Sequence, residues 1–381
     1  MNPEDVTGLI LAAGFSQRMG DFKPLMRLGG MTVIERTIRL FQSAGVHRVL
    51  VVVGYRAQEL IPLVEKCGAH VSINAQYEKG MFFSVAAGVA ALDEATGAFF
   101  VLPVDIPLVR PATLRDLLAA FPAGDAAICH PSFGGRRGHP PLIGRRHIHA
   151  ILTWAAPGGL GALLGRLERH ALDVAVIDEF IHQDLDRPAD FRRMADRLER
   201  RDVLSPAECA ALLNDRLKVL PTVAAHGRAV AEMALRMGRA LNAAGFALDL
   251  ELIYAAALVH DMARGAPEHA RRGAQLLREL DMPLMADIVA THMDLAVTEQ
   301  DPIREAEVVF LADKLMAEDR FVGIEARYGS RLSAHGADDG VQVAILAKLA
   351  SARRSAARVE RATGRSPASL WHAAPSIRPN P

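Results

Sequence analysis

The chain has 381 residues, of which 50% are apolar and 23% are charged, and its 44 lysines and arginines balance 44 aspartates and glutamates. A net charge of zero argues against a general nucleic-acid binder, whose affinity depends on an excess of cations. This length predicts two domains, because single domains usually contain ~100–200 residues.

The cysteines and the apolar pattern argue against a disulfide-rich protein and against a membrane-spanning protein. Cys67, Cys129 and Cys209 lie far apart in the sequence and cannot form a disulfide framework or a CxxC metal site. No apolar run reaches the ~18–20 residues that a membrane span needs, and the first residues, Met1–Asp5, lack a basic signal-like segment. We therefore expect a cytoplasmic protein that acts without a membrane.

Short runs rich in Val, Ile, Leu and Phe alternate with helical patterns in the first half of the chain. The predicted strands are Val6–Ala13, Arg48–Val53, Ala98–Leu102, Ala126–His130 and Leu172–Ile177. The predicted helices between them are Val33–Ala44, Ala57–Cys67, Ser84–Glu94 and Ala112–Ala120. The alternation predicts an α/β doubly wound, mostly parallel sheet with helices on both faces, in which ligands bind beyond the carboxyl ends of the strands.

The second half has a different, all-helical pattern. The charge-rich segment Leu198–Asp202 predicts a hinge, and Ser205-Pro206-Ala207-Glu208 is typical of a helix cap. Helices are predicted at 206–218, 222–243, 249–261, 267–280, 283–292 and 303–319, with no convincing strand. We expect domains at 1–197 and 205–335, and a helical extension at 336–381 that contains Val341–Thr363 and a frayed end.

A loop with the sequence LAAGFSQRMGDFKPL, residues 11–25, follows the first predicted strand. Small residues near the start of this loop let its backbone approach a base and a triphosphate closely. The backbone amide N–H groups can then bind the triphosphate oxygens. Arg18 and Lys23 add two cations suited to the charge of departing pyrophosphate. The alternative interpretation is a glycine-rich turn with two solvated charges.

Asp105 follows the predicted strand Ala98–Leu102, within the sequence Pro103-Val104-Asp105-Ile106-Pro107. Its carboxylate is expected at the same mouth of the sheet as the loop. Mg²⁺ favours carboxylate and phosphate oxygens and keeps several waters, so one or two aspartates suffice to hold it. The alternative is that Asp105 caps the next helix.

Residues 11–25 resemble the signature of MobA-like nucleotidyltransferases, and Ala13 with Lys23-Pro24-Leu25 resembles their molybdenum cofactor cytidylyltransferase branch. Further matching elements are Asn74-x5-Gly80-x3-Ser84, Pro103–Pro107, Arg137–Pro141 and Asp184–Asp190. The resemblance implies that the nucleotide is bound by Leu11, Ala12, Ala13, Gly14, Asn74 and Ser84. It implies catalytic roles for Arg18, Lys23 and Asp105, and Mg²⁺ held by Asp105 and Asp186.

The acceptor side resembles the family less completely. His139 lies in the matching Arg137–Pro141 element, where an acceptor contact and a packed loop residue are both compatible with the sequence. The family usually has Gly-Asp-x-Gly-Ala-Arg where this chain has Gly158-Gly159-Leu160-Gly161-Ala162-Leu163. The acid and the arginine of that element are replaced by Gly159 and Leu163.

The helical half contains His260-Asp261 at the end of the apolar run Leu252–Val259. A His–Asp pair at the end of a buried helix is costly unless something compensates its charge, and a metal ion is the usual compensation. A buried histidine that donates to a neighbouring aspartate is the alternative.

The order of acidic and imidazole residues in this half resembles the HD-domain metal-dependent phosphohydrolases, roughly over residues 206–330. The ligands implied by the resemblance are His226, His260, Asp261, His269, His292 and Asp313, of which His260 and Asp261 are also the implied catalytic pair. Such ligands suit one or two ions of Mn, Fe, Co, Ni or Zn. Lys314 is either a phosphate contact or an exposed lysine, and an inactive HD fold that still binds nucleotide is the alternative.

Together these patterns predict a bifunctional enzyme that joins a nucleotidyltransferase to a phosphohydrolase. The resemblance implies transfer from an NTP, with cytosine as the base, to a phosphorylated small-molecule acceptor, namely molybdopterin or its molybdenum-loaded form. It also implies a molybdoenzyme or its chaperone as a partner, and no nucleic acid or membrane. The alternatives are a helical domain that senses a nucleotide and regulates the transferase, and a sugar-phosphate nucleotidyltransferase.

Overall fold

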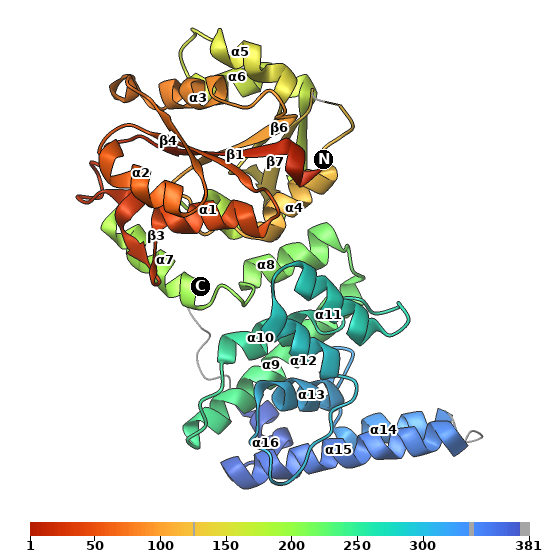
Figure 1. The fold of residues 1–381 in the computed structure, drawn as a ribbon. Helices are drawn as coiled ribbons and strands as arrows, with labels where there is room; N and C mark the ends of the chain where they lie inside the picture. Colours follow the sequence, from red (N-terminus) through yellow and green to blue (C-terminus); the bar gives the residue numbers. More distant parts are fainter. Residues whose placement is uncertain (125, 335–338, 374–381) are drawn as a thin grey trace. The chain divides into compact units, whose positions relative to one another are not determined.

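The structure is a computed structural model that describes residues 1–124, 126–334 and 339–373. The chain divides into two compact units, Met1–Arg201 and Asp202–Pro381, and Figure 1 shows that the first contains a sheet and the second is built of helices. None of the helices in the described ranges combines the length and the apolar character that a bilayer crossing needs.

The N-terminal unit is built on a mixed sheet in the order β10-β7-β9-β6-β1-β4-β5, with β8 paired to β7. Its strands are β1 (Val6–Ala12), β4 (Arg48–Val53), β5 (His70–Ile73), β6 (Ala98–Pro103), β7 (Ile128–Phe133), β8 (Arg136–Arg137), β9 (Leu142–Gly144) and β10 (Ala171–Ala175). The short hairpin of β2 (Arg27–Leu28) and β3 (Met31–Thr32) lies outside this sheet. The predicted parallel character is confirmed, because β4, β1 and β6 are mutually parallel and so are β7 and β10.

The sequence prediction missed β5, β8 and β9 of this sheet, and also the hairpin of β2 and β3. Strand β9 has only three residues and runs antiparallel between β6 and β7, so it is too short to produce a strand periodicity. Strand β5 is an edge strand with no fully buried residue, and it therefore lacks the continuous apolar run by which the inner strands were recognised.

Helices cover both faces of this sheet, as predicted. They are α1 (Val33–Ser43), α2 (Ala57–Lys66), α3 (Met81–Ala90), α4 (Pro111–Ala120), α5 (Ile148–Leu152), α6 (Gly159–Arg166) and α7 (Pro188–Glu199). One core cluster joins α1, α2, α4 and α7 to one face, and a second joins α3, α5 and α6 to the other (Figure 1).

One predicted helix in this unit has the wrong bounds. The helix expected at Ser84–Glu94 begins at Met81 and ends at Ala90, where the turn around Asp93 replaces it. The hinge expected at Leu198–Asp202 contains the division between the two units, which falls after Arg201. It is shorter than predicted, because Leu198 still belongs to α7 and packs against the core.

The C-terminal unit contains all the predicted helices. They are α8 (Pro206–Ala211), followed by a π turn (Leu212–Arg216), α9 (Pro221–Ala243), α10 (Leu250–Val259), α11 (His269–Glu279), α12 (Pro283–Thr291), α13 (Glu305–Leu315), α14 (Ile324–Ala334), α15 (Asp339–Thr363) and α16 (Pro367–His372). The predicted cap is confirmed, because Ser205 and Glu208 form a reciprocal capping box at the start of α8.

The expectation of no strand in this unit is wrong. The segments β11 (Met316–Ala317) and β12 (Arg320–Phe321) form a small antiparallel hairpin directly after α13. Its turn begins at Glu318, whose backbone adopts a left-handed conformation with φ of 53°. Strands of two residues carry no period-2 signal, so the sequence pattern could not reveal them.

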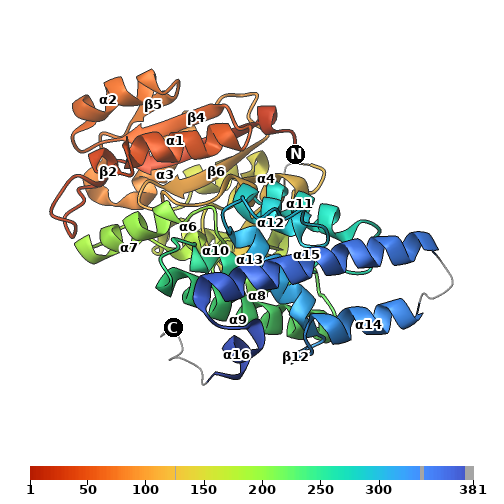
Figure 2. The same cartoon turned by 90° about the horizontal axis from the view of Figure 1, so that it is seen from below.

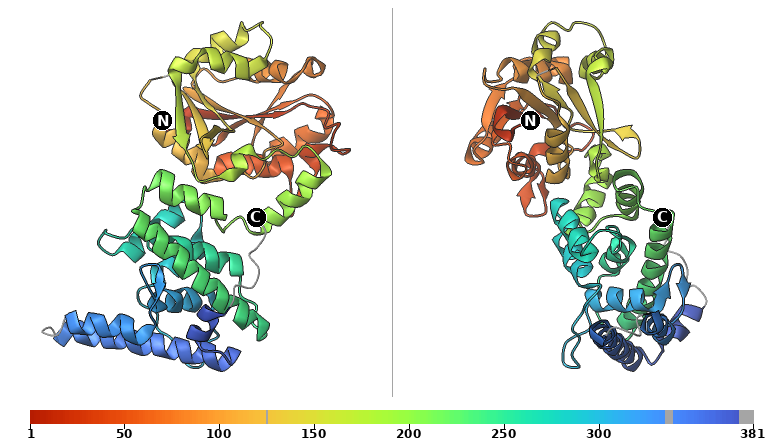
Figure 3. Two further views of the ribbon diagram at one scale, coloured as in Figure 1. Left: turned by 180° about the vertical axis from the view of Figure 1, so that it is seen from behind. Right: turned by 90° about the vertical axis from the view of Figure 1, so that its right-hand side faces the viewer.

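Helix α15 is an integral part of the helical core, and Figure 2 shows it crossing α13. Its buried Arg358 lies 3.1 Å from a carboxylate oxygen of Glu307 on α13 and donates to the carbonyls of Thr298 and Asp301. Helix α15 also lies beside α14 (Figure 3), and Arg353 of α15 pairs with Glu325 of α14.

The short helix α16 contacts α9. The ring of Trp371 stacks on Phe321 of β12 at 6.1 Å, and Arg236 of α9 donates to the carbonyls of Trp371 and Ala373. The prediction of a frayed end is therefore wrong for Pro367–His372, which Ser366 caps. Residues 374–381 lie outside the described ranges.

Candidate active sites

The loop after β1 lines a cavity of about 300 Å³, the loop cavity. Its lining residues are Leu11, Ala12, Ala13, Gly14, Phe15, Ser16, Lys23, Pro24, Tyr77, Glu78, Gly80, Met81, Ser84, Pro103, Val104 and Asp105. A Cβ atom built on Gly14 would meet no atom within 4 Å, so glycine leaves open space beside the backbone there. The cavity lies at the carboxyl ends of β1 and β6, as the sequence predicted.

Lys23 connects the two aspartates that the sequence singled out. Its Nζ lies 3.3 Å from Oδ2 of Asp105 and 2.8 Å from Oδ1 of Asp186, and Arg18 lies 2.7 Å from the other oxygen of Asp186. The backbone N–H of Leu185 donates to the carbonyl of Asp105 at 2.8 Å, which fixes the two acidic segments side by side. Four residues from three distant segments therefore meet at one point.

The two carboxylates differ in their environment. Burial raises the pKa of Asp105, and the charge of Lys23 only partly opposes this. Burial also acts on Asp186, but the hydrogen bond and charge of Lys23, together with Arg18, outweigh it and lower the pKa. Helix α4 begins after Arg110 without a side-chain cap, so Asp105 does not cap it. Two carboxylates beside the loop cavity are a donor set that fits Mg²⁺.

Asn74 and Ser84, both predicted to bind nucleotide, contact each other. The Nδ2 of Asn74 donates to Oγ of Ser84 at 3.0 Å, and both side chains are buried. Ser84 lines the loop cavity and Asn74 does not, so Asn74 positions Ser84. The sequence analysis overlooked Phe15 and Tyr77, whose rings lie 5.3 Å apart at the cavity; an aromatic residue within the Asn74–Gly80 element was the available signal.

A second cavity of about 550 Å³, the side cavity, shares Leu11, Met81 and Pro103 with the loop cavity. Its remaining lining residues are Phe82, Val85, Val101, His130, Arg137, Gly138, His139, Pro141, Gly158, Gly159, Leu160, Gly161, Leu164 and Gly165. The structure thus brings the Arg137–Pro141 element and the divergent Gly158–Leu163 segment to one cavity. His130 was not singled out in the sequence.

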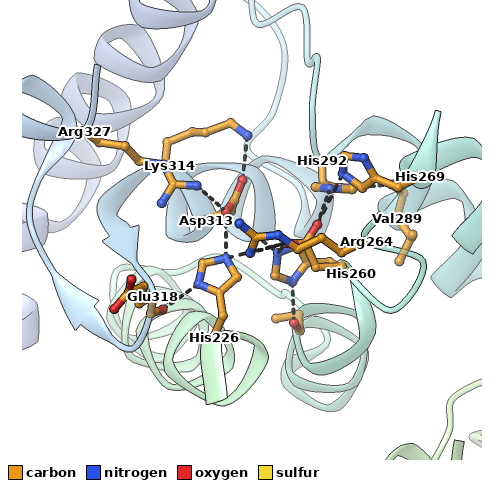
Figure 4. A network of polar contacts seen from close by, with 12 residues as sticks. His226, His260, Arg264, His269, Val289, His292, Asp313, Lys314, Glu318 and Arg327 are labelled. Atoms are coloured by element: carbon orange, nitrogen blue, oxygen red, sulfur yellow. Dashed lines mark hydrogen bonds and ion pairs between the residues drawn. The ribbon is translucent and has the colours of Figure 1, made fainter. Parts of the chain in front are cut away.

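In the C-terminal unit, the six predicted metal ligands form a single cluster, the imidazole cluster (Figure 4). Two triplets of ligand atoms each lie within 4.8 Å: His226, His260 and Asp261 form one, and Asp261, His269 and His292 form the other. Asp261 belongs to both and presents a different oxygen to each, at 3.3 Å from His269 and 4.0 Å from His226. Such a shared carboxylate is suited to bridge two ions.

The imidazole rings are oriented by backbone carbonyls. Nδ1 of His226, His260 and His292 lies 2.6, 2.8 and 2.6 Å from the carbonyls of Glu318, Ala257 and Val289. Because a carbonyl oxygen only accepts, each Nδ1 carries a proton, and each Nε2 is the nitrogen left to act as a metal ligand. The Nε2 atoms of His260 and His292 are buried and have no hydrogen-bond partner among the described residues. Unpartnered nitrogens beside carboxylates are a donor set that fits divalent transition metals.

Asp313 is held on both sides by cations. Its Oδ2 lies 2.6 Å from Lys314 Nζ, and its Oδ1 lies 3.0 Å from Arg327 and 3.2 Å from His226 (Figure 4). Burial opposes its ionisation, but Lys314 and the imidazoles outweigh burial and hold its pKa well below the usual range. Lys314 is only 1% exposed, so the alternative of an exposed, solvated lysine is wrong.

A cavity of about 330 Å³, the hairpin cavity, opens beside the imidazole cluster. Its lining residues are His226, Arg264, Ala317, Glu318, Val322, Ala326, Arg327 and Ser330. The almost fully buried His226 thus forms part of the wall of a space large enough for a small phosphate ester, and two arginines lie at the same wall.

Family models match both units. Residues 8–171 match the model of the MobA-like NTP transferase domain, and residues 223–318 match the model of the HD domain. The chain therefore contains a nucleotidyltransferase domain followed by an HD domain.

Curated relatives match shorter stretches. A bifunctional IPC transferase and DIPP synthase of Rubrobacter xylanophilus is 36% identical over 30% of this chain and 27% of that protein. A 2-aminoethylphosphonate cytidylyltransferase of Lancefieldella rimae is 36% identical over 28% of this chain and 45% of that protein. A nucleotidyl transferase structure from Methanothermobacter covers 51% of this chain and 98% of its own, with 26% identity and a TM-score of 0.46. The chain thus spans less than half the length of these curated relatives.

Proposed function

We propose that the chain is a bifunctional enzyme whose N-terminal unit transfers a cytidylyl group from CTP to molybdopterin or its molybdenum-loaded form and whose C-terminal unit is a metal-dependent phosphohydrolase. The observation that carries the first activity is the pair of adjoining cavities with Lys23, Asp105 and Asp186 at the mouth of the sheet. The similarity to a cytidylyltransferase supports cytosine as the base.

In the proposed transfer, an acceptor phosphate oxygen attacks the α-phosphorus of CTP, and the bond from that phosphorus to the β-phosphate oxygen breaks. Lys23 and Arg18 stabilise the negative charge on the departing pyrophosphate. The backbone from Leu11 to Gly14 binds phosphate oxygens and the base edge. Mg²⁺ held by Asp105 and Asp186 would neutralise phosphate charge when bound.

The transfer is tested by incubating the full chain with Mg²⁺, molybdopterin and each NTP in turn. The proposal predicts pyrophosphate release with CTP and a product that mass spectrometry identifies as the cytidylylated acceptor. No pyrophosphate release would contradict the acceptor, and a product from a sugar phosphate would identify a sugar-phosphate nucleotidyltransferase instead.

The observation that carries the second activity is the pair of buried Nε2 atoms of His260 and His292 beside Asp261, for which the described part of the chain offers no hydrogen-bond partner. Divalent ions bound there would supply Lewis-acid activation of a phosphate ester and of water. The carbonyls of Ala257 and Val289 orient the imidazoles, and Arg264 and Arg327 at the hairpin cavity are suited to bind phosphate oxygens.

The hydrolase is tested by metal analysis and a phosphatase screen on the wild-type chain and on His260→Ala and Asp261→Ala. Bound metal with turnover that both substitutions abolish supports hydrolysis. Nucleotide binding without turnover, together with altered transferase kinetics, would instead identify the HD domain as a sensor.

A further inference from the structure

The side cavity contains two buried imidazole nitrogens without partners. Nε2 of His130 and Nδ1 of His139 find no hydrogen bond among the described residues, and both histidines line this cavity. His130 is only 8% exposed. An unsatisfied buried polar atom costs free energy comparable to a lost hydrogen bond. Two such atoms at one cavity indicate that a ligand completes them.

The fold determines where both rings lie. His130 and Ile128 alternate with Cys129 on β7, so they share one face of the sheet, and Ile128 packs in the cluster with Leu163 and Leu164 of α6. His139 follows Gly138, whose N–H donates to the carbonyl of Pro131 at 2.8 Å.

Gly138 itself is required for the position of His139. A Cβ atom at Gly138 would come within 2.6 Å of the backbone and side chain of Ile181. Glycine therefore allows the chain to approach Ile181 closely, and the N–H of His139 donates to the carbonyl of Ile181 at 3.0 Å.

The charges around the side cavity point to an uncharged ligand group. Arg137 is the one lysine or arginine among the described lining residues, and its guanidinium lies 2.5 Å from Asp173 and 2.5 Å from Glu168. These two carboxylates raise the pKa of Arg137 and balance its positive charge. Burial lowers the pKa of both His130 and His139, so the two rings are neutral and can each donate or accept a hydrogen bond.

The shape of the cavity points to a planar group. Four glycines of the segment 158–165 line it, at positions 158, 159, 161 and 165. A Cβ atom at Gly161 or Gly165 would meet no atom within 4 Å, so α6 presents open backbone there. Phe82 lines the same cavity, and a flat ring can lie against an aromatic side chain and a glycine wall.

We infer that His130 is a specificity-determining residue that, beside His139 of the acceptor element, binds the uncharged, planar heterocycle of the acceptor in the side cavity, against the glycines of α6. The inference rests on the proposed transferase function and deepens it. Because the side cavity adjoins the loop cavity at Leu11, Met81 and Pro103, a ring bound there can present its phosphate to the nucleotide. A pterin, with adjacent N–H and C=O groups on a flat ring, belongs to this class.

The test is an equilibrium titration of the full chain with 6-hydroxymethylpterin, followed by the fluorescence of the pterin. The variant His130→Phe keeps a planar ring but removes both nitrogens, and His130→Gln keeps a hydrogen-bonding group. His149→Phe is the matched control, because His149 is an exposed histidine that does not line the cavity. We expect His130→Phe to raise the Kd at least about tenfold, His130→Gln to restore part of the affinity, and the control to bind like the wild type.

A parallel measurement of CTP binding shows that each variant is folded, since His130 does not line the loop cavity. Absence of pterin binding by the wild type, or equal affinity of the wild type and His130→Phe, would overturn the inference. If the pterin binds through His130 but no NTP yields pyrophosphate with molybdopterin, the proposed transferase function fails while the binding site stands. If the transferase works and His130→Phe leaves the acceptor KM unchanged, only the inference fails.

Discussion

The loop site and the imidazole cluster differ in what balances their negative charge. Asp105 and Asp186 share Lys23, and their side chains are 24% and 18% exposed. Asp261 lies 11% exposed among four imidazoles, two of which have buried Nε2 atoms without partners in the described residues. The loop site therefore contains its own cation, Lys23, which can also contact a bound phosphate. The cluster has cations of its own, Lys314 and Arg327 at Asp313, but its two buried Nε2 atoms are donors that only a bound cation or ligand would satisfy.

The substitution Asp261→Asn should have the largest effect, because it removes the one carboxylate that both triplets share. We expect bound transition metal to be lost and phosphohydrolysis to fall to background, a loss beyond the ~10–100-fold that follows from changing a supporting partner of a metal ligand. Metal analysis and phosphate release check this. Gln275→Ala, an exposed change on α11, is the control. A fall in transferase activity would contradict the independence of the two sites.

Lys23→Met should affect the loop site alone. Removing the cation that contacts both carboxylates should lower kcat for nucleotidyl transfer by about 10²–10³-fold, the usual cost of losing one electrostatic stabiliser. Hydrolysis should stay unchanged. Lys66→Met, at an exposed position of α2, is the matched control, and pyrophosphate release is the readout. Transfer at the wild-type rate would show that Lys23 only supports the fold.

Metal removal should distinguish the two units in calorimetry. Ions at 100 times their Kd stabilise a folded unit by about 2.7 kcal/mol, so chelation should lower the melting temperature of the C-terminal unit and addition of Mn²⁺ should restore it. We expect Asp261→Asn to abolish this response. An equal response of the N-terminal unit to Mn²⁺ would remove the contrast between the two sites.

The smallest expected effect concerns a carboxylate outside both sites. The backbone and hydroxyl of Thr32 donate to Glu35 and lower its pKa below 4.5. Its stabilising contribution is therefore present above pH 4.5 and is lost as the pH falls through the lower folded-state value. Glu35→Gln should remove this acid dependence of the melting temperature and keep most of the cap, because glutamine at this position can still accept from the backbone N–H of Thr32. If the melting temperature of the variant falls at acidic pH as steeply as that of the wild type, other carboxylates cause the acid dependence.

The sequence predicted most of the fold because long inner strands and amphipathic helices produce strong periodicity. It failed where a strand is too short to produce a period-2 pattern, as for the three-residue strand β9. The imidazole cluster could be predicted as a set of residues from a resemblance. Its carbonyl partners Ala257 and Val289 precede their histidines by three residues, a local spacing, whereas Glu318 reaches His226 across 92 residues.

The side cavity could not be predicted, because its wall combines β7, the loop before β9 and α6. The sequence around His130 does not show that its Nε2 lacks a hydrogen-bond partner among the described residues, because the candidate partners come from segments that only folding brings close. In contrast, the meeting of Lys23 with Asp105 follows the general rule that ligands bind beyond the carboxyl ends of parallel strands.

The stacking of Trp371 on Phe321 has a consequence for shortened versions of the protein. Phe321 lies in the hairpin whose Glu318 carbonyl orients His226. A deletion mutant that ends before residue 367 would lack the indole that packs on this hairpin. We expect the hairpin to lose order, so that the Glu318 carbonyl no longer orients the ring of His226. A trimmed HD fragment would then retain every ligand residue and still bind metal poorly, so screens with the isolated domain should extend through α16.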